Sequence, residues 1–85
     1  MDIEYSSHFK KEYGKLNHYL QKKAEKREIV FRNNVFDPRL KTHKLHGKLK
    51  EFYSFSVGDK YRIVFALVSR SRALFLDIGD HDIYR

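Results

Sequence analysis

The sequence predicts an α+β domain in which two N-terminal helices pack on a mainly antiparallel four-stranded sheet, in the order β-α-α-β-β-β. Three observations predict it. Residues 52 to 78 contain three alternating segments rich in aromatic and β-branched side chains. Residues 7 to 32 instead repeat apolar side chains at helical spacing. A short alternating segment, Ile3-Glu4-Tyr5, precedes them and predicts a strand at or near a sheet edge. Residues 1–85 fit a single domain.

The two predicted helices each begin at a residue that favours helix starts. Ser6 is the expected N-cap of a helix over residues 7 to 15, because its hydroxyl can accept a backbone N–H of the first turn. Asn17 is expected to cap a second helix over about 17 to 32. The inner stripe of the second helix should contain Leu20, Ala24 and Phe31, with Tyr19 and Val30 at its border. Ile29 falls opposite this stripe, and we expect it to be exposed.

The second half of the chain predicts a meander of strands over residues 52 to 57, 61 to 68 and 73 to 78. A polar, basic loop over residues 38 to 48 precedes it, after a turn at Asp37-Pro38. Within each strand, these residues should share one face: Tyr53, Phe55 and Val57; Tyr61, Ile63, Phe65 and Leu67; Leu74, Leu76 and Ile78. If the helices cover one face of the sheet, the other should be partly open to water. Arg62 lies opposite the apolar set of its strand and is expected on that open face.

The charge of the chain points to a polyanionic partner. Eighteen basic and 11 acidic residues give a formal net charge of +7, for which nucleic acid is the first candidate partner and a membrane surface the second. Residues 38 to 50 contain no acid but carry five cations and two imidazoles: Arg39, Lys41, Lys44, Lys48, Lys50, His43 and His46. The absence of cysteine excludes disulfides and thiolate metal sites. The start of the chain resembles no signal peptide and no segment could span a membrane, so we expect a cytoplasmic protein.

The basic segment and the end of the chain together offer the groups that metal-free RNA cleavage needs. A base must take the 2′-hydroxyl proton, a cation must stabilise the charged phosphorane, and an acid must protonate the leaving 5′ oxygen. His43, Arg62 and His81 can fill these roles, and Tyr84 can hold a nucleotide in line. We expect Lys44, His46, Lys48, Lys50 and Lys60 to bind the RNA.

Other interpretations of these residues remain open. His43 and His46 could form a metal pair with Asp80 and Asp82, but no further histidine pair supports this, and we predict neither metal nor cofactor. Tyr84 could anchor the C-terminal segment in the core. His8 and His18 are interpreted as surface residues.

Two stretches resemble the RelE/ParE superfamily of toxins from type II toxin–antitoxin systems. The first runs from Gly47 through Phe52-Tyr53-Ser54-Phe55-Ser56-Val57-Gly58 to Tyr61-Arg62-Ile63-Val64-Phe65, and the second is Ile78-Gly79-Asp80-His81 with Tyr84 after it. The helices and the first strand also fit, so the resemblance covers nearly the whole chain.

The resemblance implies a small toxin that a cognate antitoxin neutralises. In the RelE, YoeB and YafQ branches the toxin enters the ribosomal A site, where it contacts 16S rRNA and cuts mRNA without a metal. By position, His43 matches the base on the loop, Arg62 the arginine that binds the scissile phosphate, and His81 the C-terminal acid. Tyr84 matches the aromatic residue that orients the nucleotide. No small-molecule cofactor and no membrane are implied.

The sequence departs from the YafQ-like pattern at two positions. Ser56 and Lys60 stand where that branch carries a further histidine and an aspartate, so the rate of cleavage and the codon preference are not predicted. The ParE branch, which inhibits DNA gyrase and lacks such a histidine-rich set, is the alternative. A decayed toxin that only binds its antitoxin is a third possibility.

Overall fold

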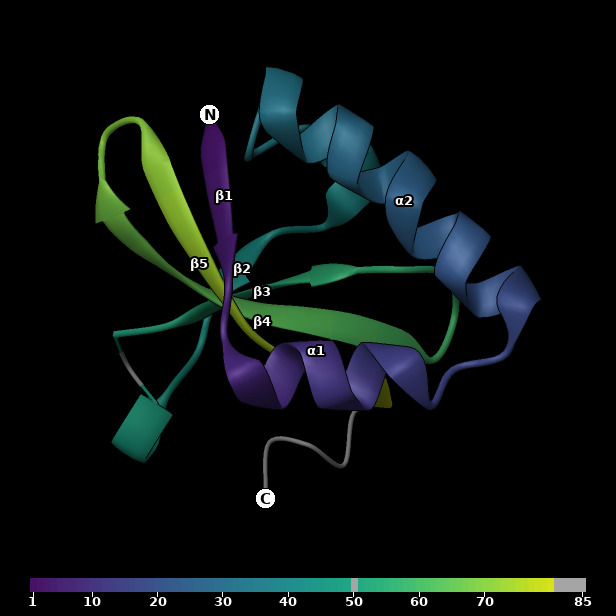
Figure 1. Cartoon of the computed structure of the whole chain (residues 1–85). Helices are drawn as coiled ribbons and strands as arrows, with labels where there is room; N and C mark the ends of the chain where they lie inside the picture. Colours follow the sequence, from purple (N-terminus) through teal and green to yellow (C-terminus); the bar gives the residue numbers. More distant parts are fainter. Residues whose placement is uncertain (50, 81–85) are drawn as a thin grey trace.

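The fold is a five-stranded sheet with two helices on one face, so the predicted α+β class is confirmed and the predicted count of four strands is wrong. The computed structural model of the chain describes residues 1–49 and 51–80 (Figure 1). The strands lie in the order β1-β5-β4-β3-β2. Only β1 and β5 are parallel, and the other neighbours are antiparallel. The strands are β1 Asp2–Tyr5, β2 His43–Lys44, β3 Tyr53–Ser56, β4 Tyr61–Ser69 and β5 Arg72–Asp80.

The strand that the sequence did not predict is β2, which lies within the predicted loop. His43 pairs with Ser54 and Lys44 with Tyr53, so the sheet extends by one short edge strand. Two residues are too few to show an alternating pattern, and only the pairing with β3 reveals them. The strand β1 occupies the opposite edge, as predicted.

Both helices begin at the predicted caps. In α1, Ser7–Gly14, the Ser6 hydroxyl accepts the backbone N–H of Phe9 at 3.0 Å. In α2, His18–Asn33, the Asn17 side chain accepts the N–H of Leu20 at 2.9 Å. No described helix is long and apolar enough to cross a membrane. Ile29 is exposed, as predicted, but Tyr19 is 67 % exposed and not at the border of the buried stripe.

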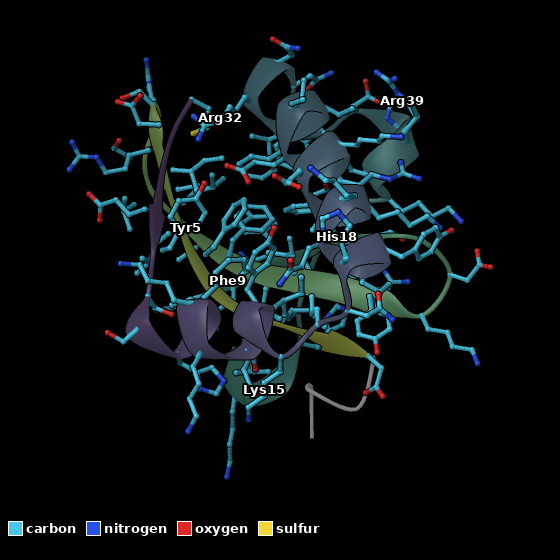
Figure 2. The ribbon with its side chains drawn as sticks, turned by 45° about the vertical axis from the view of Figure 1, so that its right-hand side comes forward. Tyr5, Phe9, Lys15, His18, Arg32 and Arg39 are labelled. Atoms are coloured by element: carbon cyan, nitrogen blue, oxygen red, sulfur yellow. The ribbon has the colours of Figure 1, made fainter. Side chains whose placement is uncertain are left out.

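The core lies between α2 and the sheet and is mainly aromatic. The Phe31 ring is fully buried, and its centroid lies 5.0 Å from that of Phe55, 4.9 Å from Phe65 and 5.2 Å from Phe75. Figure 2 shows Tyr5 and Phe9 pointing into the same interior, where the Phe9 and Phe75 centroids are 5.5 Å apart. One interlocked set of rings therefore joins α1, α2 and three strands.

The prediction that Leu74, Leu76 and Ile78 share one face is wrong, because β5 contains a bulge. Val64 pairs with Asp77 while its neighbour Phe65 pairs with Phe75, so Leu76 has no partner on β4. The extra residue shifts the alternation by one. The buried residues of β5 are therefore Ala73, Phe75 and Ile78, and Leu74 and Ile78 lie on opposite faces.

Candidate functional site

The candidate site lies on the face of the sheet opposite the helices. Residues that pair directly across neighbouring strands share a face. His43, Ser54, Val64 and Asp77 form one row across the four strands β2 to β5, and Ser56, Arg62 and Gly79 form the next. His43 and Arg62 are therefore on the same face, as predicted, two strands and two residues apart. Their Cα atoms are about 12 Å apart by strand geometry.

His43 is held by its backbone neighbours in a form suited to accept a proton. Its Nδ1 lies 3.1 Å from the Lys41 carbonyl oxygen, and its Nε2 lies 3.5 Å from the Ser54 hydroxyl. A carbonyl oxygen only accepts, so Nδ1 is the protonated nitrogen of the neutral ring. The lone pair of Nε2 then faces the Ser54 hydroxyl on β3.

The loop before β2 is ordered by a short turn that fixes the Lys41 carbonyl. A 3-10 helix, Pro38–Leu40, starts at Asp37, whose carboxylate accepts the backbone N–H of Arg39. The hydrogen bond from the Arg39 guanidinium lowers the pKa of Asp37 to about 2. The turn ends at Lys41 in the left-handed region, with φ of 51°, which few residues other than glycine adopt.

Arg62 presents a positive charge without a partner among residues 1–49 and 51–80. Its Nη1 is buried and makes no hydrogen bond there. The neighbouring serines do not satisfy it: Ser56, beside it in the row, donates its hydroxyl to the Gly58 carbonyl at 2.6 Å. Ser54 and Ser56 are buried, so this face is less open to water at β3 than the sequence predicts. A buried guanidinium nitrogen without an acceptor favours an anionic ligand.

The predicted RNA-binding residues lie in two groups. A hollow of about 300 Å³ beside β2 is lined by His43, Lys44, Leu45, His46 and Leu49. Lys44 pairs with Tyr53 and so belongs to the helix-side face, although it lines this hollow at the sheet edge. The exposed Lys48 lies in a second 3-10 helix, Gly47–Leu49. Lys60 is exposed just before β4, at the Arg62 end of the face.

Three predicted site residues, Lys50, His81 and Tyr84, lie outside the described residues. Asp80, the last described residue, pairs with Tyr61, next to Arg62. The expected acid and the expected aromatic residue thus follow the strand that borders Arg62.

His8 is exposed, as the sequence indicated, but its side chain also contacts two carboxylates. Its Nε2 lies 3.1 Å from Oδ1 of Asp77, and Glu12 joins them. These three are the candidate metal ligands in the part of the chain that the structure describes. The spacing of His8 and Glu12 was a visible signal, but the bulge that positions Asp77 was not.

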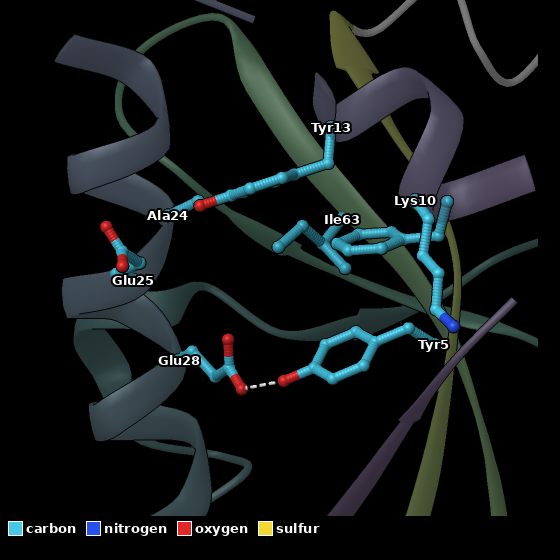
Figure 3. Close-up of a pocket in the computed structure, with 8 residues that line it drawn as sticks. Tyr5, Lys10, Tyr13, Ala24, Glu25, Glu28 and Ile63 are labelled. Atoms are coloured by element: carbon cyan, nitrogen blue, oxygen red, sulfur yellow. Dashed lines mark hydrogen bonds between the residues drawn. The ribbon is translucent and has the colours of Figure 1, made fainter. Parts of the chain in front are cut away.

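A second cavity, of about 310 Å³, lies on the helix side, between α1 and α2. Figure 3 shows Tyr5 and Tyr13 lining it opposite Glu25 and Glu28, with the phenol of Tyr5 donating to Glu28. Burial, followed by the hydrogen bond to Glu28, raises the pKa of Tyr5 to about 12. This cavity lies on the other side of the sheet from His43 and Arg62.

Comparison with known proteins identifies the fold. No family model matches the chain, and no curated protein matches it. Three solved structures similar to it are a YoeB/ParE toxin from Agrobacterium tumefaciens, the DinJ–YafQ toxin–antitoxin complex from E. coli and the YoeB–YefM complex from Staphylococcus aureus. Their TM-scores are 0.80, 0.72 and 0.77, and their identities 14 %, 23 % and 20 %. They cover 95 %, 96 % and 95 % of this chain and 99 %, 93 % and 97 % of their own chains. The chain therefore has the fold of these toxins, as the resemblance to the RelE/ParE superfamily implied.

Proposed function

We propose that the chain is the toxin of a type II toxin–antitoxin system, and that it cuts mRNA in the ribosomal A site without a metal. The observation that carries this proposal is the pair formed by His43 and Arg62 on one face of the sheet. The first is a base with an oriented lone pair, and the second is a cation without a partner among the described residues. The fold shared with YafQ and YoeB toxins supports it.

The proposed chemistry is an in-line attack within the RNA strand. Nε2 of His43 takes the proton of a 2′-hydroxyl, whose oxygen forms a bond to the adjacent phosphorus. Arg62 stabilises the added charge on the phosphoryl oxygens. As the bond from phosphorus to the 5′ oxygen breaks, His81 donates a proton to that oxygen. The products are a 2′,3′-cyclic phosphate and a 5′-hydroxyl, and Tyr84 stacks on a base to keep the three reacting atoms in line.

The basic residues around the face would hold the RNA backbone. Lys44, His46, Lys48, Lys50 and Lys60 contribute charge but no sequence selection, since phosphate contacts carry none. The net charge of +7 makes this binding weaken steeply with salt. In the ribosome the same charge would also contact 16S rRNA.

The proposed protein partner is an antitoxin. YafQ and YoeB occur in complexes with DinJ and YefM, respectively. Because this chain shares their fold, we propose that a cognate antitoxin neutralises it. That antitoxin should be acidic enough to complement the positive charge of this chain. The alternative is inhibition of DNA gyrase without RNA cleavage. It is favoured by the likeness to a YoeB/ParE toxin and by Ser56 and Lys60, which replace the further histidine and aspartate of YafQ-like proteins.

The decisive experiment incubates the purified protein with a defined mRNA, with and without ribosomes stalled at a chosen codon. Primer extension locates the cuts. The ribosome arm keeps Mg²⁺, which ribosomes need, and adds a chelator selective for transition metals; the free-RNA arm contains EDTA. Cuts that require the ribosome, survive the chelator and vanish with His81→Ala are expected. His18→Ala, an exposed histidine on α2, is the matched control and should cut normally.

Absence of cuts in every arm, with a protein that is folded by circular dichroism, would contradict the nuclease. Inhibition of gyrase supercoiling by the same sample would then establish the alternative. Growth arrest without either activity would contradict both.

A further inference from the structure

The inference concerns three side chains at the junction of α1 and β5. His8 and Glu12 are four residues apart on α1 and so lie on one face of the helix. Asp77 faces them from β5, with its Oδ1 3.1 Å from Nε2 of His8. One ligand atom from each of the three lies within 4.8 Å of the other two. The cluster therefore offers one imidazole nitrogen and two carboxylate oxygens at a single point.

Contacts of the neighbouring backbone fix this arrangement. The Ser6 hydroxyl donates to the Leu76 carbonyl at 3.1 Å, which ties the start of α1 to the bulge that precedes Asp77. The backbone N–H of Ile78 donates to Oδ1 of Asp77 at 2.9 Å and orients the carboxylate. Supporting hydrogen bonds of this kind are typical of carboxylates that bind metals.

The carboxylate of Glu12 is paired with an exposed lysine at the end of α1. Its Oε2 is buried and lies 2.8 Å from Nζ of Lys15. Figure 2 shows Lys15 at the end of α1, and its side chain is 62 % exposed. A flexible, exposed cation therefore sits where a divalent ion would compete with it.

We propose that His8, Glu12 and Asp77 bind one divalent transition-metal ion, with Zn²⁺ preferred. One imidazole and two carboxylates suit Zn²⁺, which binds such ligands at about 2.0–2.2 Å and can complete its shell with water. The three ligand atoms need to close from their present spacing by small side-chain rotations. The ion displaces Lys15 and fastens α1 to β5.

This site is separate from the proposed nuclease residues. Asp77 and His43 lie at the two ends of the row across the sheet, so their Cα atoms are about 14 Å apart by strand spacing. The proposal concerns a structural ion and does not depend on RNA cleavage.

The test titrates metal-free protein with Zn²⁺ and Co²⁺. Zn²⁺ well above its dissociation constant should raise the melting temperature by about 5 °C or more. Co²⁺ should broaden the ¹⁵N–¹H signals of residues 8 to 12 and 76 to 78 before those of residues 43 to 46, which carry two further accessible imidazoles. His8→Ala should abolish both effects, and His18→Ala should preserve them.

A second pair of variants separates a metal site from an ordinary ion-pair cluster. Lys15→Met removes the competing ammonium and should tighten Zn²⁺ binding several-fold. Lys22→Met is the matched control, because Lys22 also pairs with a glutamate three residues away and is equally exposed, at 61 %. It should leave the affinity unchanged. No binding at millimolar metal, broadening centred on residues 43 to 46, or an affinity unaffected by Lys15→Met would each overturn the proposal.

Discussion

The Nδ1 atom of His43 lies 3.1 Å from the carbonyl oxygen of Lys41, two residues earlier in the chain. This local contact decides which ring nitrogen carries the proton and which faces the sheet. Lys41 adopts its left-handed backbone directly after the turn at Pro38–Leu40, so the turn orients the carbonyl and the carbonyl orients the imidazole. The base of the proposed nuclease thus depends on backbone geometry and not on a charged side chain.

Replacement of His43 should remove catalysis and leave the fold intact. His43→Ala is expected to lower the rate of ribosome-dependent cleavage by about 10²–10⁴-fold, the usual contribution of a general base. The pH profile of the residual activity should lose its acidic limb. His43 is exposed, so the urea midpoint should not change. His46→Ala, from the same hollow, should weaken RNA binding without changing the pH profile. A His43→Ala rate within tenfold of the original would contradict the assignment of the base.

Replacement of Arg62 should affect stability and activity differently: cleavage should be lost, but the fold should not be weakened. Arg62→Met removes a cation whose Nη1 has no described partner, and it keeps an unbranched side chain in the strand. We expect the free energy of unfolding to stay constant or to rise by about 1–2 kcal/mol, while cleavage is lost. Urea denaturation and the cleavage assay measure the two effects on one sample.

The control for Arg62 is an arginine that has a partner. Arg72 on β5 lies 3.3 Å from Glu4, and both side chains are more than half exposed. Arg72→Met should cost less than about 1 kcal/mol and leave cleavage unchanged. A large loss of stability in Arg62→Met would mean that the guanidinium supports the fold and does not await a ligand.

The local parts of the fold were readable from the sequence. The caps at Ser6 and Asn17 depend on side chains that bond to a backbone three residues away, so the sequence neighbourhood contains all the information. The alternation in β4 placed Arg62 on the face opposite Ile63 and Phe65 for the same reason, since no irregularity interrupts the strand before Val64.

The misplaced parts depend on partners distant in the chain. The strand β2 forms because His43 pairs with Ser54. The bulge at Leu76 forms because β5 has one residue more than β4 between two neighbouring pairs, Val64 with Asp77 and Phe65 with Phe75. Neither leaves a periodic signal. The contact between His8 and Asp77, which are 69 residues apart in the chain, was not predicted either. For the site, the strand pairings put His43 and Arg62 on one face, whereas their roles, like those of His81 and Tyr84, stay predictions.

The central aromatic residue of α2 should dominate stability. Phe31→Ala leaves a cavity among three phenylalanine rings and should cost about 3–5 kcal/mol, enough to unfold much of so small a domain at 37 °C. Phe36→Ala makes the same chemical change at a ring that is 58 % exposed and should cost less than about 1 kcal/mol. Thermal unfolding followed by circular dichroism compares them. Equal losses would mean that the core is not centred on Phe31.

The phenol of Tyr5 should make the protein sensitive to alkali. Because its pKa is raised from 10.0 to about 12, the folded state holds the proton more tightly than the unfolded state. This stabilisation is complete below pH 10, falls as the pH rises toward 12 and is lost above it. Tyr5→Phe also loses the hydrogen bond to Glu28, which should cost about 1 kcal/mol at neutral pH.

The difference in unfolding free energy between the original protein and Tyr5→Phe should therefore shrink between pH 10 and 12. Urea denaturation at several pH values measures it, and subtraction removes the titration of the lysines common to both proteins. Tyr19→Phe, at a ring 67 % exposed on α2, should parallel the original protein throughout. A constant difference across this range would show that the phenol of Tyr5 titrates alike in both states, and that Glu28 does not hold its proton in the folded protein.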